Sequence, residues 1–352
     1  MEIGEPLVVA LARVGGPGAM AALVALGEVC ESQLGLRARD AGDRLMANGV
    51  AWPEWGDAIV EAEILRTAVM RERIFDDGVT IFIEARHGEG DEGRHAIGVY
   101  IDHNLGVMAK DIVFADSIDQ VEQSFATAPP HIGELVLEPI DPVEAGARIH
   151  AAMELTDMTI GPPVGEDYAA LRALAILRAD ELPGGEVDID RPEMPFDERD
   201  ELLADFLNAP ESDGIEPGTD AAEVARMAID YCANYVDGDP LRWSPVVVEL
   251  FMAGWLPRKL LADRVMFEAV PQALDAWVRY AGRRRGIPTE AIDYTAASIP
   301  EWTEEMLALA FDNGAAGPAK QFVTAAKDAG VDLSDQQAVA TFMAGWNARS
   351  DA

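Results

Sequence analysis

The pattern of apolar residues divides the first half of the chain into helices and a sheet. Helical spacing over 20–28 and 36–47 predicts short helices near the start. Four runs rich in β-branched and other apolar residues follow, at 63–71, 79–86, 95–102 and 107–115, and Asp-, Asn- and Gly-containing turns separate them. This order predicts a four-stranded antiparallel meander at about 62–116.

The second and third strands of this meander can be aligned on their apolar residues. If His87 faces His95, then Ile83 faces Val99, and the remaining isoleucines of both strands fall on the same face. The opposite face then alternates polar, charged and aromatic side chains. One consistently apolar face predicts that the sheet is covered by helices on that side.

Helical patterns resume after the meander. The run Asp141-Pro142-Val143-Glu144 is typical of a helix start, with an aspartate cap, proline in the first turn and glutamate at the third position. We expect that helix to reach about residue 155, and another to cover 167–179. From Asp220 onward the patterns are helical only, with starts expected at Ser244-Pro245 and Pro271. The predicted fold is therefore α+β, a helix-flanked four-stranded antiparallel meander followed by an all-α C-terminal domain.

A strongly acidic segment separates these two patterns. Residues 183–220 contain 13 acidic residues, two arginines and five prolines, and only 197–207 has helical spacing. Dense like charge and proline disfavour packing. We therefore predict an α+β domain at 1–182, an acidic Pro-rich linker at 183–219 and a helical domain at 220–352.

The net charge of −36 over 352 residues narrows the classes of partner. Such a charge repels nucleic acid phosphates and anionic lipid headgroups, so general affinity for nucleic acid or for a membrane is not expected. It is compatible with a basic protein partner or with mimicry of a nucleic acid, and also with solubility combined with a GC-rich coding bias towards Ala, Gly, Asp, Glu and Arg. The two cysteines, Cys30 and Cys232, form no metal or redox motif, and the apolar N-terminal stretch is interrupted by Gly15-Gly16-Pro17-Gly18. We expect a cytoplasmic protein without a cofactor.

One segment reverses this charge. Between Pro240 and Pro288 there are eight Arg or Lys residues against four acidic ones, a net charge of +4, together with three of the seven tryptophans. Cationic and aromatic side chains together can bind an anion or a nucleic acid segment. Docking onto the chain's own acidic linker is the simplest interpretation. The predicted binding residues are Trp243, Trp255, Arg258, Lys259, Arg283, Arg284 and Arg285.

Two groups on the meander carry residue types used in catalysis or metal binding. His87 and His95 would be cross-strand neighbours in the register above, and paired imidazoles near carboxylates can bind zinc or iron. They match no standard ligand spacing, so capping of the apolar face is the alternative. The second group is Asp102, His103, Lys110 and Asp111, in which an acid beside a histidine could act as a general base. The same residues are also ordinary turn chemistry.

Three stretches of the chain resemble a family of actinobacterial proteins. They are HAIGVYIDHNLGVMAKDI (95–112), DPLRWSPVVVELFMAGWLPRKLL (239–261) with QALDAWVRYAGRRRGIP (272–288), and AGVDLSDQQAVATFMAGWNAR (329–349). The resemblance implies a cytoplasmic actinobacterial origin and assigns no activity, cofactor or catalytic residue. The third stretch repeats the Phe-Met-Ala-Gly-Trp of the second, which an ancient duplication or coincidence would explain equally well.

The sequence carries no complete catalytic motif. We therefore expect a non-enzymatic interaction or regulatory protein that uses the Trp/Arg patch of the C-terminal domain. The alternative is a hydrolase or metal-dependent enzyme whose site surrounds Asp102, His103, Lys110 and Asp111, or the His87/His95 hairpin end.

Overall fold

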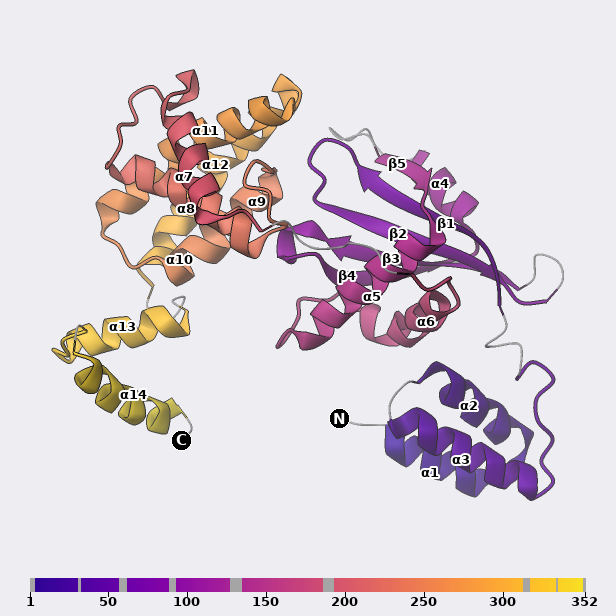
Figure 1. Ribbon diagram of the computed structural model, residues 1–352. Coiled ribbons are helices and arrows are strands. Elements are labelled where there is room, and N and C mark those ends of the chain that lie inside the picture. Colours follow the sequence, from indigo (N-terminus) through magenta and orange to yellow (C-terminus); the bar gives the residue numbers. More distant parts are fainter. Residues whose placement is uncertain are drawn as a thin grey trace. The chain divides into compact units, whose positions relative to one another are not determined.

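The chain folds into two compact units, Met1–Asp190 and Arg191–Ala352. The computed structural model describes residues 4–30, 33–56, 62–88, 93–126, 135–185, 193–312, 317–333 and 335–350. The first unit contains helices and one antiparallel sheet, and the described part of the second unit is helical (Figure 1). The α+β class is therefore confirmed.

Three helices at the start form a small bundle with its own core. They are α1 (Gly4–Val14), α2 (Gly16–Val29) and α3 (Gln33–Ala47). Met20 and Leu23 of α2 are fully buried, and Ala38 and Leu45 of α3 lie in the same cluster. No helix in the described ranges is both long enough and apolar enough to cross a membrane.

The sheet has five strands rather than the predicted four. Its order is β4-β3-β2-β1-β5, formed by β1 (Glu63–Glu72), β2 (Gly78–Arg86), β3 (Arg94–Asp102), β4 (Met108–Ala115) and β5 (Leu135–Pro139). The missed strand β5 pairs antiparallel with β1. It is short and ends in proline, which an edge strand tolerates but which obscures the alternating pattern that identifies a strand.

The predicted register of β2 and β3 is wrong by two residues. His95 pairs with Ala85, and Ile83 pairs with Ile97. The hairpin closes earlier than expected, because the His87 N–H donates to the Gly93 carbonyl at 3.1 Å. A shift of two residues leaves every side chain on its original face. The predicted apolar face is therefore confirmed, and Ile81, Ile83, Ile97, Val99 and Ile101 are all buried on it.

Helices cover the two faces of the sheet unequally. The apolar face packs against α5 (Pro142–Met158) and α6 (Tyr168–Asp180), whose buried residues share one cluster with it. The shorter α4 (Ile118–Ala126) packs over part of the opposite face, where Ile118 contacts Ala68 and Phe82 (Figure 1). The predicted start of α5 is confirmed, because Asp141 Oδ1 accepts the Val143 N–H at 2.9 Å.

The helical unit contains α7 (Phe196–Leu207), α8 (Asp220–Tyr235), α9 (Pro245–Glu249), a π-helix (Leu250–Trp255), α10 (Leu256–Lys259), α11 (Arg264–Arg285), α12 (Thr289–Ala310), α13 (Pro318–Asp328) and α14 (Gln336–Ser350). Its core is rich in aromatic residues, and Trp277 contacts both Phe206 and Tyr280. The predicted start of α11 at Pro271 is wrong. The helix begins at Arg264, where the Asp263 carboxylate accepts the Met266 N–H, and Pro271 lies inside it.

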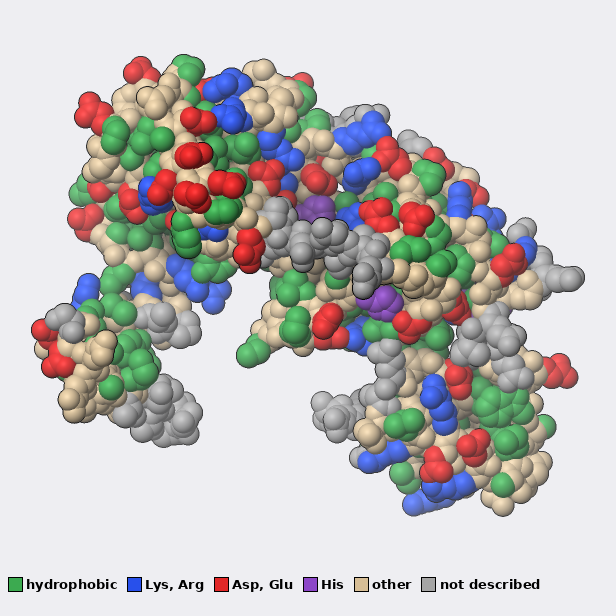
Figure 2. Space-filling model, viewed as in Figure 1, with side chains coloured by type: hydrophobic (Ala, Val, Ile, Leu, Met, Phe, Trp, Pro, Cys, Tyr) green, Lys and Arg blue, Asp and Glu red, His purple; other side chains and the backbone are tan. Residues whose placement is uncertain are grey.

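The acidic range 183–219 contains a helix of this unit. Leu202, Leu203 and Phe206 of α7 are buried in the helical core. The acidic residues of α7 face outward, and Figure 2 shows carboxylate side chains gathered over α7 and α8. An amphipathic helix can thus carry dense negative charge on its solvated face and still pack. The helical unit therefore begins before Asp220, and residues 186–192 lie outside the described ranges.

Candidate functional site

The structure brings only two of the four predicted catalytic residues together. Asp102 is 4% exposed, and its carboxylate accepts hydrogen bonds from Lys110 Nζ and from the Asn104 N–H, both at 2.8 Å. It caps the short 3₁₀ helix His103–Leu105 that follows β3. Asp102 and Lys110 therefore do come together, and both contacts stabilise the β3–β4 turn.

His103 and Asp111 point to other partners. His103 Nδ1 lies 2.9 Å from the backbone oxygen of Asp76, on the turn before β2. Asp111 lies against Gly165, where a Cβ atom would come within 2.5 Å of the Asp111 carboxylate. The four side chains therefore do not converge on one point where a substrate could react.

His87 and His95 do lie together, although they do not form a cross-strand pair. Their rings stack with centroids 5.2 Å apart. Arg178 of α6 binds both imidazoles: its Nε donates to His95 Nε2 at 3.0 Å, and its Nη2 lies 2.7 Å from His87 Nε2. Arg178 is 1% exposed and also pairs with Glu181 at 2.8 Å. We call these four residues the His–Arg cluster.

Burial shifts the pKa values of three members of the His–Arg cluster. Burial lowers the pKa of His95. The hydrogen bond to the Gly93 carbonyl opposes this shift, and the positive charge of Arg178 reinforces it. Burial likewise lowers the pKa of Arg178 and raises that of Glu181, and their mutual attraction opposes both shifts. A neutral His95 can accept the Arg178 hydrogen bond, whereas a protonated one cannot.

The same geometry bears on metal binding. Both Nε2 atoms face the guanidinium, so a metal ion at that position would have to displace a cation that is already bound there. Among the described residues, no group of three or more His, Cys, Asp or Glu side chains is arranged to hold a metal ion. Arg178 and Glu181 were not predicted from the sequence, because they lie at the end of α6, more than eighty positions from the two histidines.

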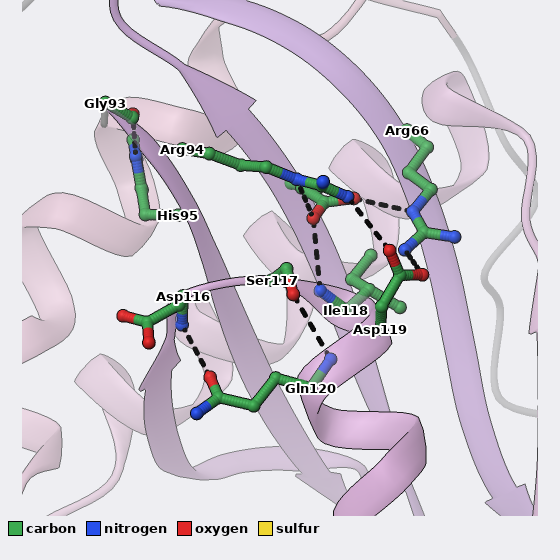
Figure 3. Close-up of polar contacts among 10 residues, drawn as sticks. Arg66, Gly93, Arg94, His95, Asp116, Ser117, Ile118, Asp119 and Gln120 are labelled. Carbon is green, nitrogen blue, oxygen red and sulfur yellow. Dashed lines mark hydrogen bonds and ion pairs between the residues drawn. The ribbon is translucent and has the colours of Figure 1, made fainter. Parts of the chain in front are cut away.

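A second charged cluster occupies the opposite face of the same end of the sheet. The Glu84 carboxylate is buried, and it accepts hydrogen bonds from Arg66 Nε at 2.6 Å, Arg94 Nε at 2.8 Å and the Ile118 N–H at 3.2 Å. Asp119 of α4 pairs with both arginines, which point towards it in Figure 3. We call this the Glu84 clamp, because it fixes the start of α4 to β1, β2 and β3.

Hydrogen bonding keeps Glu84 ionised. Burial alone would raise its pKa, but hydrogen bonds from Arg94, Arg66 and the Ile118 N–H together lower it. Asp116 and Gln120, drawn beside the clamp in Figure 3, form backbone and side-chain contacts around the start of α4 instead. All charges of the clamp have partners within the unit, which indicates a structural role.

In the helical unit, four of the seven predicted binding residues are held by an indole hydrogen bond or an ion pair. Trp243 is 7% exposed, packs edge-on against Phe251, and donates its indole N–H to the Pro240 carbonyl at 2.9 Å. The three consecutive arginines at the end of α11 each pair with an acid: Arg283 with Glu211, Arg284 with Asp205 and Arg285 with Asp239. Glu211 and Asp205 belong to the acidic range 183–219.

The other three, Trp255, Arg258 and Lys259, lie together around the π-helix. Trp255 is half-buried; its ring stacks on Phe251 with centroids 5.7 Å apart and meets Tyr235 edge-on with centroids 5.8 Å apart. Tyr235 is 46% exposed, and Lys259 Nζ lies 5.8 Å from its ring centroid. We call Tyr235, Trp255, Arg258 and Lys259 the aromatic–cationic surface.

The π-helix has a local cause in the sequence. The Leu256 N–H donates to the Phe251 carbonyl, five residues back, so the turn is wider than in an α-helix. In a regular helix, the ring of Pro257 would clash with the carbonyl of Ala253, and a wider turn relieves such a clash. The second Phe-Met-Ala-Gly-Trp segment, at 342–346, lies in the regular helix α14.

The cations of this surface differ from those at the end of α11. Arg258 and Lys259 are exposed, and neither forms an ion pair with any described residue.

Comparison with known proteins adds no further assignment, because no family model, no curated protein and no solved structure matches the chain.

Proposed function

We propose that the protein is a non-enzymatic interaction protein, and that the aromatic–cationic surface of its helical unit binds a short acidic segment of another protein. The observation that carries the proposal is the pairing of cations in this unit. Arg283, Arg284 and Arg285 have acidic partners, whereas the exposed Arg258 and Lys259 have none among the described residues.

The side chains of the surface indicate the chemistry of the partner. Exposed cations attract carboxylates, and arginine can bind a carboxylate through two hydrogen bonds. The exposed part of Tyr235 and the half-buried Trp255 offer apolar area, and aromatic residues are enriched among those that dominate binding energy at interfaces. An acidic segment with an apolar or aromatic residue between its carboxylates fits both features.

The charge of the whole chain separates this partner from a nucleic acid. A nucleic acid would bring many phosphates close to a protein of net charge −36, and only two cations of this surface would oppose that repulsion. A short acidic segment brings fewer charges. At physiological ionic strength, charges farther than about 8 Å from a bound segment are largely screened, so the cations next to it determine whether it binds.

A peptide titration tests this proposal. The intact protein is titrated against a fluorescently labelled peptide that has glutamates on both sides of one phenylalanine, and against the same peptide with glutamines. We expect binding of the glutamate peptide that weakens with salt, and about tenfold weaker binding of the glutamine peptide.

Two variants of equal charge locate the binding. Arg258→Gln/Lys259→Gln should weaken binding of the glutamate peptide by about tenfold, the sum of two modest charge pairs. Arg264→Gln/Lys327→Gln removes two exposed cations elsewhere in the same unit and should leave it unchanged. Equal loss in both variants, or no preference for the glutamate peptide, would overturn the proposal.

A further inference from the structure

A pocket lies on the part of the sheet that α4 does not cover. The row of side chains beyond α4 consists of Met70, Thr80 and Tyr100, which pair across β1, β2 and β3. These three residues line a cavity of about 230 Å³, together with Phe75 in the turn before β2 and Leu135 of β5. Phe75 is buried, so the turn provides a fixed apolar wall.

The charged side chains at the pocket, Arg71, Glu72 and Asp77, already have partners. The Glu72 carboxylate accepts three backbone N–H groups of the turn that follows it, at 2.6, 2.6 and 3.2 Å. Arg71 is bound to Glu138 at 2.6 Å, and Asp77 also has a partner within the protein. A charged ligand would therefore lose hydration in this pocket without meeting an available counter-charge, which is unfavourable.

One polar group of the pocket differs from these. Thr80 is only 8% exposed, and no hydrogen bond joins its hydroxyl to any described residue. Thr67, buried on the neighbouring strand β1, instead donates its hydroxyl to the Ile140 carbonyl at 2.6 Å. A buried hydroxyl can both donate and accept hydrogen bonds, and leaving them unmade costs free energy. The Thr80 hydroxyl is therefore the group of this pocket that is available to an oxygen atom of a ligand.

We infer that this pocket binds a small neutral molecule that joins an aromatic ring to one hydroxyl or carbonyl oxygen. The ring would lie between Met70, Phe75 and Leu135, because thioether and aromatic walls both favour an aromatic partner, and the oxygen would lie at Thr80. At about 30 Å³ for each water molecule, the volume suits a ligand on the order of ten heavy atoms. This inference is independent of the partner proposed for the helical unit.

Three probes of one shape test the preference for a neutral ligand: 2-phenylethanol, 2-phenylethylamine and phenylacetate. Each is titrated into the full chain carrying ¹³C-methyl methionine, and the Met70 signal, assigned with Met70→Leu, reports on the pocket directly. We expect a saturable shift with the alcohol and about tenfold weaker binding of both ions, because each ion gives up hydration without gaining a counter-charge. A Met70 signal that does not respond to the alcohol, or an ion that binds as tightly as the alcohol, would overturn the inference.

A second pair of probes tests the role of the Thr80 hydroxyl. In propylbenzene, a methyl group replaces the hydroxyl of 2-phenylethanol. Thr80→Val removes the protein hydroxyl and keeps the branched side chain, so it should weaken binding of the alcohol by about fivefold and leave binding of propylbenzene unchanged. An equal change for both probes, or no change for the alcohol, would contradict a hydrogen bond from the ligand to Thr80.

Two leucines of similar exposure provide a matched control for the position of the ligand. Leu135 is 42% exposed and lines the pocket, whereas Leu7 of α1 is 43% exposed and does not. Leu135→Ala should weaken binding of the alcohol by about fivefold through loss of apolar contact, and Leu7→Ala should leave it unchanged. The remaining methionine signals show whether each variant is folded. Equal affinity of the two variants would overturn the inference.

Discussion

At the hairpin end of the sheet, Glu84 and Arg178 are buried, and each contacts several charged or polar side chains of its own unit. On the helical unit, Arg258 and Lys259 are exposed and have no acidic partner among the described residues. The comparison teaches that charge density alone does not identify a binding site. Charges that are buried with partners hold the fold together, whereas exposed charges without partners are available to another molecule.

The largest expected effect on stability comes from the His–Arg cluster. Arg178→Met removes the hydrogen bonds to both histidines and leaves the partly buried Glu181 carboxylate without its cation. We expect the free energy of unfolding to fall by about 3 kcal/mol, as for other buried ion pairs that lose one partner. Urea denaturation measures it. A loss no larger than that of a surface substitution would show that the buried His–Arg cluster does not hold the fold together.

A smaller loss is expected from the Glu84 clamp. Glu84→Gln keeps the shape of the side chain but removes the charge between Arg66 and Arg94, which are partly exposed and still have Asp119. We expect the free energy of unfolding to fall by about 2 kcal/mol. Asp119→Asn, at the exposed edge of the same clamp, should cost less. The reverse order of the two variants would show that Glu84 is not the centre of the network.

The His–Arg cluster should also make the free energy of unfolding depend on pH, in a pH range where the Glu84 clamp has no such effect. Because the folded protein lowers the pKa of His95, the unfolded chain takes up the proton first. The stabilisation is complete above about pH 6.5, the ordinary histidine pKa, and is lost as the pH falls below it. Glu84 has a lowered pKa too, and its contribution is lost only below about pH 4.5.

Denaturation between pH 7 and 5.5 measures this dependence. His95→Gln preserves an acceptor for Arg178 but cannot titrate, so its stability should change less over the same interval than that of the unaltered protein. This difference cancels the pH dependence that the rest of the chain shows in both proteins. Parallel pH curves for the two proteins would contradict a neutral His95.

The smallest effect on stability belongs to the aromatic–cationic surface. Arg258→Gln/Lys259→Gln removes no described ion pair and should change the free energy of unfolding by less than about 0.5 kcal/mol. Tyr235→Phe should be similarly mild, since the ring contact with Trp255 remains. If the double variant destabilised the protein as much as Glu84→Gln, Arg258 and Lys259 would have a structural role. The contrast between buried charges that stabilise the fold and exposed charges that do not would then be contradicted.

The sequence predicts the sheet well because alternation of apolar residues reports which face is buried. It cannot report the length of the hairpin loop, so the register of β2 and β3 is off by two residues while the faces are right. The proximity of His87 and His95 is therefore predicted correctly, although their pairing is not. The short edge strand β5 carries too little pattern to be recognised.

The site residues were harder to predict because their roles depend on contacts far along the chain. Arg178 approaches the two histidines only when α6 packs on the sheet, more than eighty positions away in sequence. Trp243 and Trp255 have similar sequence surroundings, yet one is buried and the other half-exposed. Basic residues near tryptophan indicate a patch, but only the packing shows which of its cations already have partners.

The most direct test compares the two groups of cations in the helical unit by peptide binding. Arg258→Gln/Lys259→Gln and Arg283→Gln/Arg284→Gln remove the same charge, so long-range electrostatics change equally. The account predicts that only the first variant loses affinity for the glutamate peptide, by about tenfold, and that only the second loses stability. Equal affinity of the two variants, or loss of affinity in the second alone, would contradict the claim that the exposed cations without an acidic partner among the described residues form the binding surface.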